Sequence, residues 1–182
     1  ETGSPATGAR FLKGSILTKY QKVNWENGVL GYPVSDEICG MRDGGCRQDF
    51  ENGSILWSSA TGAHYMRGKI NEKYTAVGRE AGKLGYPVTD ELCGMRAGGC
   101  RQKFQHNSGH IYWSPGTGAH VVRGKIMERY AAIKAELEPM GYPTTDEICG
   151  LKDGGCFQKF ETAENTTHPR AIYYSPAGGT WE

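Results

Sequence analysis

The sequence predicts an α+β chain of three tandem repeats of about 55 residues, packed into a compact, quasi-symmetric array. Each repeat is expected to form a short helix followed by a small antiparallel β-hairpin or meander. The main observation is a Cys-Gly-x-x-x-Gly-Gly-Cys segment that begins at Cys39 and returns at Cys93 and Cys149, in steps of 54 and 56 residues. A Gly-Tyr-Pro segment at 31–33 returns at 85–87 and 141–143.

Glycine is the second observation, because 20 of the 27 glycines fall on seven positions that recur from one repeat to the next. A glycine kept in internal copies indicates a backbone with positive φ or a close approach by another group. We place the repeats at about 4–57, 58–113 and 114–176, within a single domain over 4–182. Residues 1–3 precede the pattern and are interpreted as a remnant of how the chain was produced.

Each repeat opens with a predicted helix. Ile70, Tyr74 and Val77 lie at i, i+4 and i+7, which places them on one helical face. The same stripe occurs at positions 16, 20 and 23, and at positions 126, 130, 133 and 137. The helix must end before the Gly-Tyr-Pro segment, because the residue ahead of proline is pushed out of the helical region.

Strands follow the helix. Residues 101–104 and 110–114 are rich in aromatic and β-branched side chains and predict a hairpin, with 119–123 as a third strand. From the Phe of the first strand to the last aromatic residue of the second, the separation is 7 residues in repeat one, 9 in repeat two and 14 in repeat three. The hairpin tip is therefore an exposed turn that tolerates extra residues.

Composition excludes several classes of protein. The formal net charge is +1, with 23% charged and 10% aromatic residues, which argues against disorder. Lysine and arginine form no dense run, so we expect no nucleic-acid partner. No apolar run reaches the ~18 residues that cross a bilayer, so we expect no membrane insertion.

The six cysteines form three Cys-x6-Cys pairs, which predict the disulfides Cys39–Cys46, Cys93–Cys100 and Cys149–Cys156. Zinc is the competing interpretation, but two pairs must meet at one metal, and three pairs leave one over. We therefore expect no metal and no cofactor. Disulfides place the protein in an oxidising compartment, and the sequons at Asn52 and Asn165 predict a secreted glycoprotein.

The repeated segments resemble a known family. Leu30-Gly-Tyr-Pro33, Leu84-Gly-Tyr-Pro87 and Met140-Gly-Tyr-Pro143 resemble the signature of LGFP repeats, and the resemblance covers residues 4 to 180. It implies a non-catalytic module of secreted actinobacterial proteins, among them mycoloyltransferases and cell-wall amidases, with arabinogalactan as the suggested ligand. Tyrosine replaces phenylalanine in every copy, and the cysteine pairs are not part of the usual family pattern. A different secreted setting, eukaryotic for example, is therefore also open.

On this basis we expect an extracellular module, not an enzyme, that binds a cell-surface or cell-wall glycan through weak, equivalent sites. The main alternative is an extracellular protein–protein recognition or adhesion module that uses the irregular third hairpin, residues 162–170. A cell-wall hydrolase is the least favoured function. It would need one pair of carboxylates in unlike environments, whereas the acid pairs here are triplicated. The sequence leaves the oligomeric state open.

Candidate ligand-binding residues are aromatic side chains that stack on sugar rings and polar groups that bond hydroxyls. Strand alternation puts Tyr112 and Tyr173 on one face of their strands and Trp57, Trp113 and Tyr174 on the other, which Ile111 shares. The polar candidates are His64, His120, Arg10, Gln48, Gln102, Gln158, Asp36, Asp90 and Asp146. Each also has a structural interpretation, namely core packing for the aromatic residues and bonds to loop backbone for the Gln and Asp residues.

Overall fold

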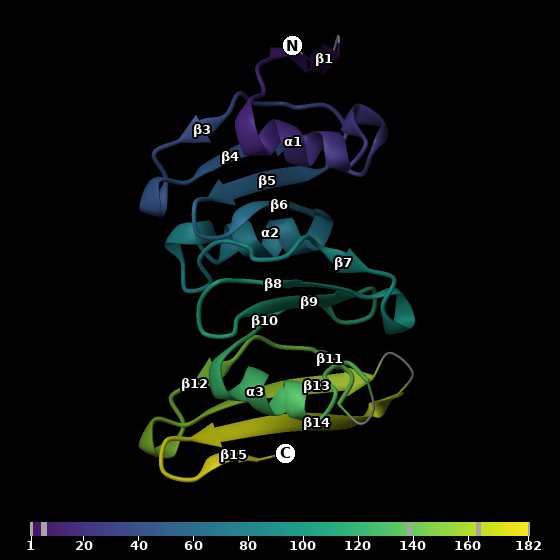
Figure 1. Cartoon of the computed structure of the whole chain (residues 1–182). Coiled ribbons are helices and arrows are strands. Elements are labelled where there is room, and N and C mark those ends of the chain that lie inside the picture. Colours follow the sequence, from purple (N-terminus) through teal and green to yellow (C-terminus); the bar gives the residue numbers. More distant parts are fainter. Residues whose placement is uncertain (1, 5–6, 138–139, 163–164, 182) are drawn as a thin grey trace. The chain divides into compact units, whose positions relative to one another are not determined.

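A computed structural model describes residues 2–4, 7–137, 140–162 and 165–181 (Figure 1). The chain divides into two compact units, which are described separately. The first contains residues 1–91 and 104–106, and the second contains residues 92–103 and 107–182.

The first unit contains two helices, α1 and α2, and a four-stranded antiparallel sheet in the order β3-β4-β5-β6. A short antiparallel pair, β1 with β2, precedes α1. The elements are β1 (Thr2–Ser4), β2 (Gly8–Arg10), α1 (Gly14–Lys22), η1 (Trp25–Asn27), β3 (Ile38–Cys39), η2 (Arg42–Gly44), β4 (Cys46–Phe50), β5 (Gly53–Ser58), β6 (Gly62–Arg67), α2 (Gly68–Ala76) and η3 (Arg79–Ala81).

The second unit contains α3 and two sheets, one in the order β10-β9-β8-β7 and one in the order β11-β13-β14-β15, with β12 also paired to β13. Its elements are β7 (Leu92–Cys93), η4 (Arg96–Gly98), β8 (Cys100–Lys103), β9 (His110–Ser114), β10 (Gly118–Val122), α3 (Gly124–Ala132), β11 (Tyr142–Pro143), β12 (Ile148–Cys149), η5 (Lys152–Gly154), β13 (Cys156–Thr162), β14 (Asn165–Ser175) and β15 (Gly179–Trp181).

The predicted fold class is confirmed, with three repeats that each combine one nine-residue helix with antiparallel strands. The helix of the third repeat is shorter than its apolar stripe suggested. It ends at Ala132, because Lys134 and Ala135 have positive φ values of 70° and 51°. Leu137, which we had placed on the helical face, therefore lies beyond the helix and is 46% exposed.

A buried tyrosine ties each helix to the Gly-Tyr-Pro turn of its own repeat. In the three repeats the hydroxyl donates to a glycine carbonyl at the start of that turn: Tyr20 to Gly31 at 2.9 Å, Tyr74 to Gly85 at 2.8 Å and Tyr130 to Gly141 at 2.6 Å. Burial raises the pKa of Tyr20 to about 12, so this hydroxyl keeps its proton and remains a donor at neutral pH.

The three predicted disulfides are confirmed. Cys39–Cys46, Cys93–Cys100 and Cys149–Cys156 each join residues that are opposite one another on two paired strands. A glutamate carboxylate lies beside each pair, but an oxidised sulfur offers no thiolate to a metal ion. Each bridge therefore closes the loop that contains the recurring Gly-Gly segment.

The two glycines of that segment serve different purposes. Gly44 has a φ of 73°, a conformation that disfavours other residues. Gly45 has an ordinary φ of −74°, and it is glycine because the Tyr86 ring occupies the space of a Cβ. The Tyr86 hydroxyl donates to the carbonyl of Arg42 at 2.5 Å.

The second unit repeats this contact with different residues. The ring of Tyr142 fills the space beside Gly99, and its hydroxyl donates to the carbonyl of Arg96 at 2.5 Å. In both units, the tyrosine of one Gly-Tyr-Pro turn therefore packs into the disulfide loop of the preceding repeat. We call the space beside the second glycine, with the loop carbonyl that accepts the bond, the tyrosine socket.

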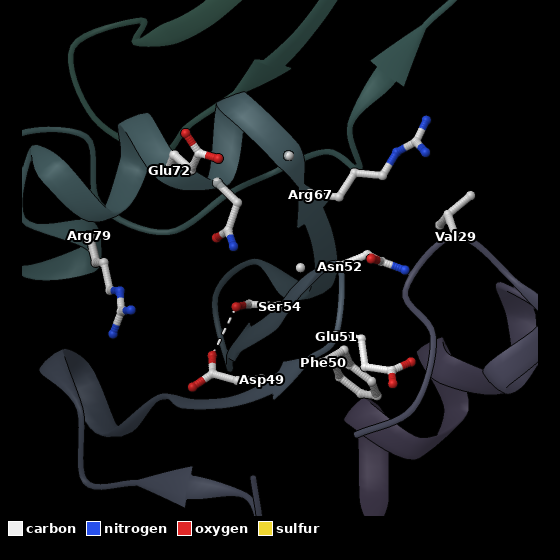
Figure 2. A pocket seen from close by; sticks show the side chains of 12 residues that line it. Val29, Asp49, Phe50, Glu51, Asn52, Ser54, Arg67, Glu72 and Arg79 are labelled. Carbon is white, nitrogen blue, oxygen red and sulfur yellow. Dashed lines mark hydrogen bonds between the residues drawn. The ribbon is translucent and has the colours of Figure 1, made fainter. Parts of the chain in front are cut away.

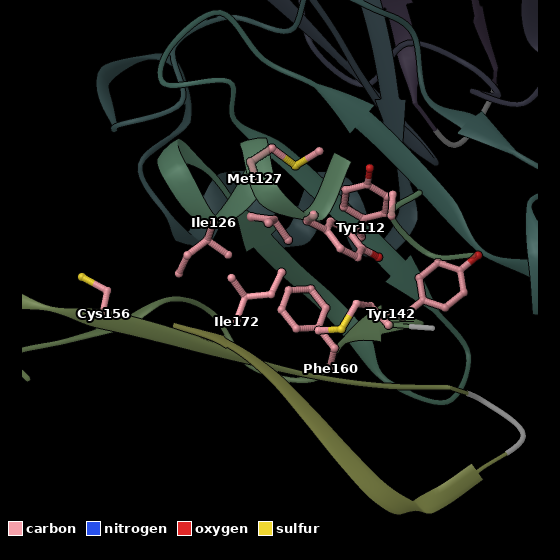
Figure 3. Packing of buried hydrophobic residues seen from close by; sticks show 11 residues of the cluster. Tyr112, Ile126, Met127, Tyr142, Cys156, Phe160 and Ile172 are labelled. Atoms are coloured by element: carbon pink, nitrogen blue, oxygen red, sulfur yellow. The ribbon is translucent and has the colours of Figure 1, made fainter. Parts of the chain in front are cut away.

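A helix with sheets on two sides forms the core of the second unit (Figure 3). Ile126, Met127 and Tyr130 of α3 belong to one buried cluster with Tyr112 of β9 and with Phe160 and Ile172 of the last sheet. The helix thus covers one sheet with one side and a second sheet with the other. This arrangement buries the Tyr112 face of its strand as completely as the Ile111 face.

The socket predicts an asymmetric response to one substitution. Gly99→Ala places a methyl group inside the Tyr142 ring and should lower the free energy of unfolding by about 2 kcal/mol. Gly155→Ala is the matched control, because Gly155 has a φ of −69° and a methyl group there meets no tyrosine ring, the nearest atom being the Tyr174 carbonyl oxygen at 3.0 Å. Urea unfolding with the disulfides intact measures both, and equal losses in the two variants would contradict the assignment.

Candidate functional site

The three aspartates proposed as ligand acceptors instead hold the backbone that leads into the helices. Asp36 accepts the N–H of Phe11 at 3.1 Å, Asp90 that of Tyr65 at 3.1 Å and Asp146 that of Val121 at 2.9 Å. Each bond joins a residue in a strand, or directly after one in the case of Phe11, to a loop about 25 residues further along the chain. Of the two interpretations that the sequence left open, the contacts favour the structural one.

Asp90 has the densest set of partners. Lys19 Nζ lies 2.8 Å from one carboxylate oxygen, and His64 Nδ1 lies 3.3 Å from the other. Burial alone would raise the pKa of Asp90, but the hydrogen bonds from His64, Lys19 and the Tyr65 N–H outweigh it and lower the pKa. The ionised form of Asp90 is therefore part of the folded structure.

Internal contacts also occupy the histidines. His64 Nε2 lies 2.9 Å from the carbonyl of Thr61, and His120 Nε2 lies 2.9 Å from that of Thr117. A carbonyl only accepts, so Nε2 must carry a hydrogen, while Nδ1 faces Asp90 or Asp146. Both ring nitrogens of each histidine thus face the protein itself. Arg10, at the equivalent place in the first repeat, lies on β2 and is partly exposed.

The glutamines are not surface ligands, which corrects one interpretation of the sequence. Gln48, Gln102 and Gln158 are 0%, 1% and 0% exposed. The amide of Gln48 donates to the carbonyls of Phe11 and Ser35 at 3.1 and 2.8 Å, and that of Gln158 makes the equivalent pair of bonds to Val121 and Thr145 at 2.9 and 2.7 Å. A buried amide that satisfies two loop carbonyls stabilises the fold and is closed to a sugar.

Of the two interpretations that the sequence left open for Tyr112, core packing is favoured over a sugar platform, because Tyr112 is 0% exposed in the core around α3. Tyr173, at the same position in the third repeat, is 47% exposed and stacks on Phe157, with ring centroids 5.3 Å apart. Trp57, Trp113 and Tyr174 are partly buried, and Trp57 and Tyr174 pack against the cores of their units. Among these aromatic candidates, Tyr173 alone is an exposed residue.

A cleft of about 630 Å³ opens in the first unit, between the β4–β5 hairpin and α2 (Figure 2). Acidic, basic and amide side chains dominate its lining, with Phe50 and Val29 adding apolar surface. The lining residues are Val29, Asp49, Phe50, Glu51, Asn52, Gly53, Ser54, Arg67, Gly68, Asn71, Glu72 and Arg79.

Several polar groups of the cleft are held in place by neighbours. Asp49 accepts the Ser54 hydroxyl at 2.8 Å, and Glu51 accepts the N–H of Tyr32 at 2.9 Å. Arg67 Nε lies 2.9 Å from Glu91, whose own pKa is raised by burial against the opposing effect of Arg67. These bonds orient the carboxylates and the guanidinium before any ligand arrives, which reduces the entropy lost on binding.

The cleft exists because the repeats differ at two positions. Asn71 of α2 corresponds to Met127 of α3, which is 4% exposed and part of the core in the second unit. Ser54 corresponds to His110, whose ring lies over Tyr112 with centroids 5.8 Å apart. The three equivalent binding sites expected from the repeats are therefore not supported, since larger side chains stand at these positions in unit two.

The sequence analysis missed this cleft, and among its lining residues it had proposed a functional role only for Asn52, as a glycosylation site. Asn52 is exposed at the hairpin turn, where it is accessible to modification, so glycosylation there stays a prediction. Asn165 opens β14, but its side chain lies outside those that the structure describes. The same holds for most side chains of the third hairpin, so its proposed role in protein recognition also stays a prediction.

Comparison with known proteins identifies the repeat. The family model described as LGFP repeat matches residues 30–82, 84–137 and 140–182. Among curated proteins, none matches the chain. Of the helices in the described residues, none has the length and apolarity to span a membrane.

The contacts of Asp90 predict a pH-dependent loss of stability. Asp90→Asn should lower the free energy of unfolding by about 1 kcal/mol above pH 4, because the carboxylate loses its charged partners. A lowered pKa in the folded state stabilises above the ordinary value of 3.8, and this contribution disappears as pH falls through the folded pKa. Urea unfolding between pH 2.5 and 5.5 should show the two proteins converging at the acid end.

Asp43→Asn is the matched control, because the side chain of Asp43 is 68% exposed and its ion-pair partner is the exposed Arg42. It should change the free energy of unfolding little at any pH in this range. A difference between wild type and Asp90→Asn that stays constant down to the lowest pH would contradict the role of the ionised Asp90.

Proposed function

The chain belongs to the LGFP repeat family, a repeat module of secreted and cell-wall-associated proteins, and from this premise we propose that it binds a cell-surface or cell-wall polysaccharide in the cleft of its first unit. The binding is non-catalytic. The three disulfides support the extracellular setting, because such bridges persist in oxidising compartments.

The composition of the cleft is the observation that carries this proposal. Three carboxylates, from Asp49, Glu51 and Glu72, face the same space as two guanidinium groups, from Arg67 and Arg79. A sugar hydroxyl both donates and accepts, so it can bond a carboxylate on one side and a guanidinium on the other. Neighbouring hydroxyls on a pyranose or furanose ring suit this mixture of planar acceptors and planar donors.

The size and charge of the cleft support the same ligand class. A volume of about 630 Å³ lies within the ~300–1,000 Å³ range of small-molecule sites and can hold a short stretch of a polymer. Three acids and two arginines leave a net charge near −1, which suits a neutral chain better than a strongly anionic one. Val29 and Phe50 add apolar surface for the C–H faces of sugar rings.

Binding without hydrolysis fits the state of the carboxylates. Glycoside hydrolysis requires one protonated and one ionised carboxyl group on opposite sides of the scissile bond. Asp49 and Glu51 instead each accept an internal hydrogen bond, from the Ser54 hydroxyl and from the Tyr32 N–H, and do not form an opposed pair of this kind. Glu91 has a raised pKa, but its side chain is 6% exposed and paired with Arg67.

The proposal predicts that Asn71→Met abolishes binding, because it introduces at α2 the side chain that α3 carries at the equivalent, buried position. Arg79→Ala should weaken binding about tenfold through loss of a charged hydrogen bond. Isothermal titration calorimetry against arabinogalactan, peptidoglycan and a panel of soluble glycans measures both, and wild type should bind one chain segment per molecule.

Tyr173→Ala is the matched control, since Tyr173 is exposed and aromatic but lies in the second unit, outside the cleft. It should bind as wild type does. Loss of binding in Tyr173→Ala with full binding in Asn71→Met would move the site to the aromatic pair, and no binding of wild type to any of these glycans would overturn the proposal.

A further inference from the structure

The tyrosine socket occurs three times in the chain, and two of the three are filled. Tyr86 fills the socket at Gly45 within the first unit, and Tyr142 fills the socket at Gly99 within the second. In each case the tyrosine is almost completely buried, at 1% and 2% exposure. The same contact therefore joins successive repeats of this chain twice.

The third socket has no tyrosine from the described part of the chain. A methyl group added at Gly155 would meet the Tyr174 carbonyl at 3.0 Å and the Leu151 side chain at 3.4 Å, whereas at the other two glycines it would meet a phenol ring. The carbonyl of Lys152 is the equivalent of the Arg42 and Arg96 carbonyls that accept the hydroxyl. The backbone has the same form, with a φ of −69° at Gly155 against −75° at Gly99.

Exposed apolar side chains lie on the segments that form this third socket, Leu151 beside Gly155 and Tyr173 opposite Phe157 on the neighbouring strand. Tyr173 is 47% exposed and stacked on Phe157, and Leu151 is 37% exposed. The residues that correspond to Tyr173 in the earlier repeats, Leu56 and Tyr112, are 1% and 0% exposed. The surface that a following repeat covers elsewhere is thus open at the end of the third repeat.

A tyrosine that lacks a socket lies at the opposite end of the repeat series. Tyr32 belongs to the first Gly-Tyr-Pro turn, and its carbonyl accepts the Glu51 N–H at 3.0 Å, as that of Tyr86 accepts the Gln105 N–H at 2.9 Å. Tyr32 is partly exposed, and within the described residues its hydroxyl makes no hydrogen bond. Phe11, in the same repeat, is 61% exposed.

We propose that a second copy of this chain docks onto the third repeat by placing its Tyr32 in the socket at Gly155. The hydroxyl of the incoming Tyr32 donates to the carbonyl of Lys152, and its ring covers Gly155. The occupant follows from continuity with the internal joints, because within the described residues the Gly155 socket holds no ring and Tyr32 fills no socket, and the two are the halves of a contact that is made twice elsewhere. The association is head-to-tail, so a pair of copies keeps one open socket and one free Tyr32 for further copies.

Two short strands must give way for the copies to join. Gly179 pairs with Ser175 as Gly62 pairs with Ser58, so β15 occupies beside β14 the position that β6 occupies beside β5. In the incoming copy this position in the repeat belongs to β2, whose equivalent edge is paired with β1, Ser4 with Gly8. We therefore infer that β2 of the incoming copy leaves β1 and replaces β15, each of which is held by three residue pairs. Removal of residues 1–4 together with residues 178–182 should accordingly strengthen association.

Sedimentation velocity from micromolar to millimolar concentration tests the proposal. Wild type should show a rising average mass as concentration increases. Tyr32→Phe should weaken association about tenfold through loss of one hydroxyl bond. Gly155→Leu should leave the chain monomeric, because the side chain fills the socket, while a φ of −69° is open to any residue and the Cβ lies 3.0 Å from the Tyr174 carbonyl oxygen.

A mixing experiment gives the sharpest readout. Tyr32→Ala retains the socket and Gly155→Leu retains the tyrosine, so each alone should be monomeric while an equimolar mixture forms a dimer and nothing larger. Thermal unfolding of each variant confirms that it is folded, and Tyr32→Phe serves if Tyr32→Ala is not. A monomeric wild type at every concentration, unchanged association in the variants, or a mixture that stays monomeric would each overturn the proposal.

The outcome is independent of glycan binding. Gly155 does not line the cleft and makes no contact with its lining residues, so Gly155→Leu should keep the polysaccharide affinity of wild type. A failure of the association experiment therefore does not contradict glycan binding, and a failure of glycan binding does not contradict association.

Discussion

The contact of a tyrosine ring with a glycine of the preceding repeat is the constraint on which the other features depend. It requires glycine at positions 45 and 99 although their φ values are ordinary, and it requires a disulfide loop that presents a carbonyl to the hydroxyl. Burial, with the nearby Glu136 carboxylate, raises the pKa of Tyr142 to about 12, so this donor does not ionise at physiological pH. The helix and the Gly-Tyr-Pro turn position the tyrosine, and the disulfide loop positions the glycine that it contacts.

The polar side chains that recur in every copy form hydrogen bonds with backbone groups. The aspartates accept strand N–H groups, and Gln48 and Gln158 donate to loop carbonyls. Features suited to ligand binding arise instead where the copies diverge, as at Asn71 against Met127 and at Ser54 against His110. In a repeat protein of this kind, the recurring positions maintain the scaffold and the exceptions distinguish one surface from another.

Much of the fold could be predicted because its signals are local. The i, i+4, i+7 stripe located the helices, and cysteines seven positions apart can bridge neighbouring strands without help from distant residues. Burial of Tyr112 was not predictable in this way, because strand alternation shows which side chains share a face but not what packs on that face. The cleft was missed for the same reason. Asn71 lines a cleft only because the hairpin of the previous repeat, some twenty residues earlier in the chain, lies opposite it.

The filled sockets also bear on how such a chain can change in length over evolution. Each contact takes its tyrosine from one repeat and its glycine from the repeat before, and every repeat contains one of each. Duplication or loss of a whole repeat by unequal recombination therefore creates no mismatched pair inside the array. Insertion or deletion of part of a repeat would instead separate a tyrosine ring from the glycine that accommodates it. The number of residues in the array can therefore change without damage only by whole repeats.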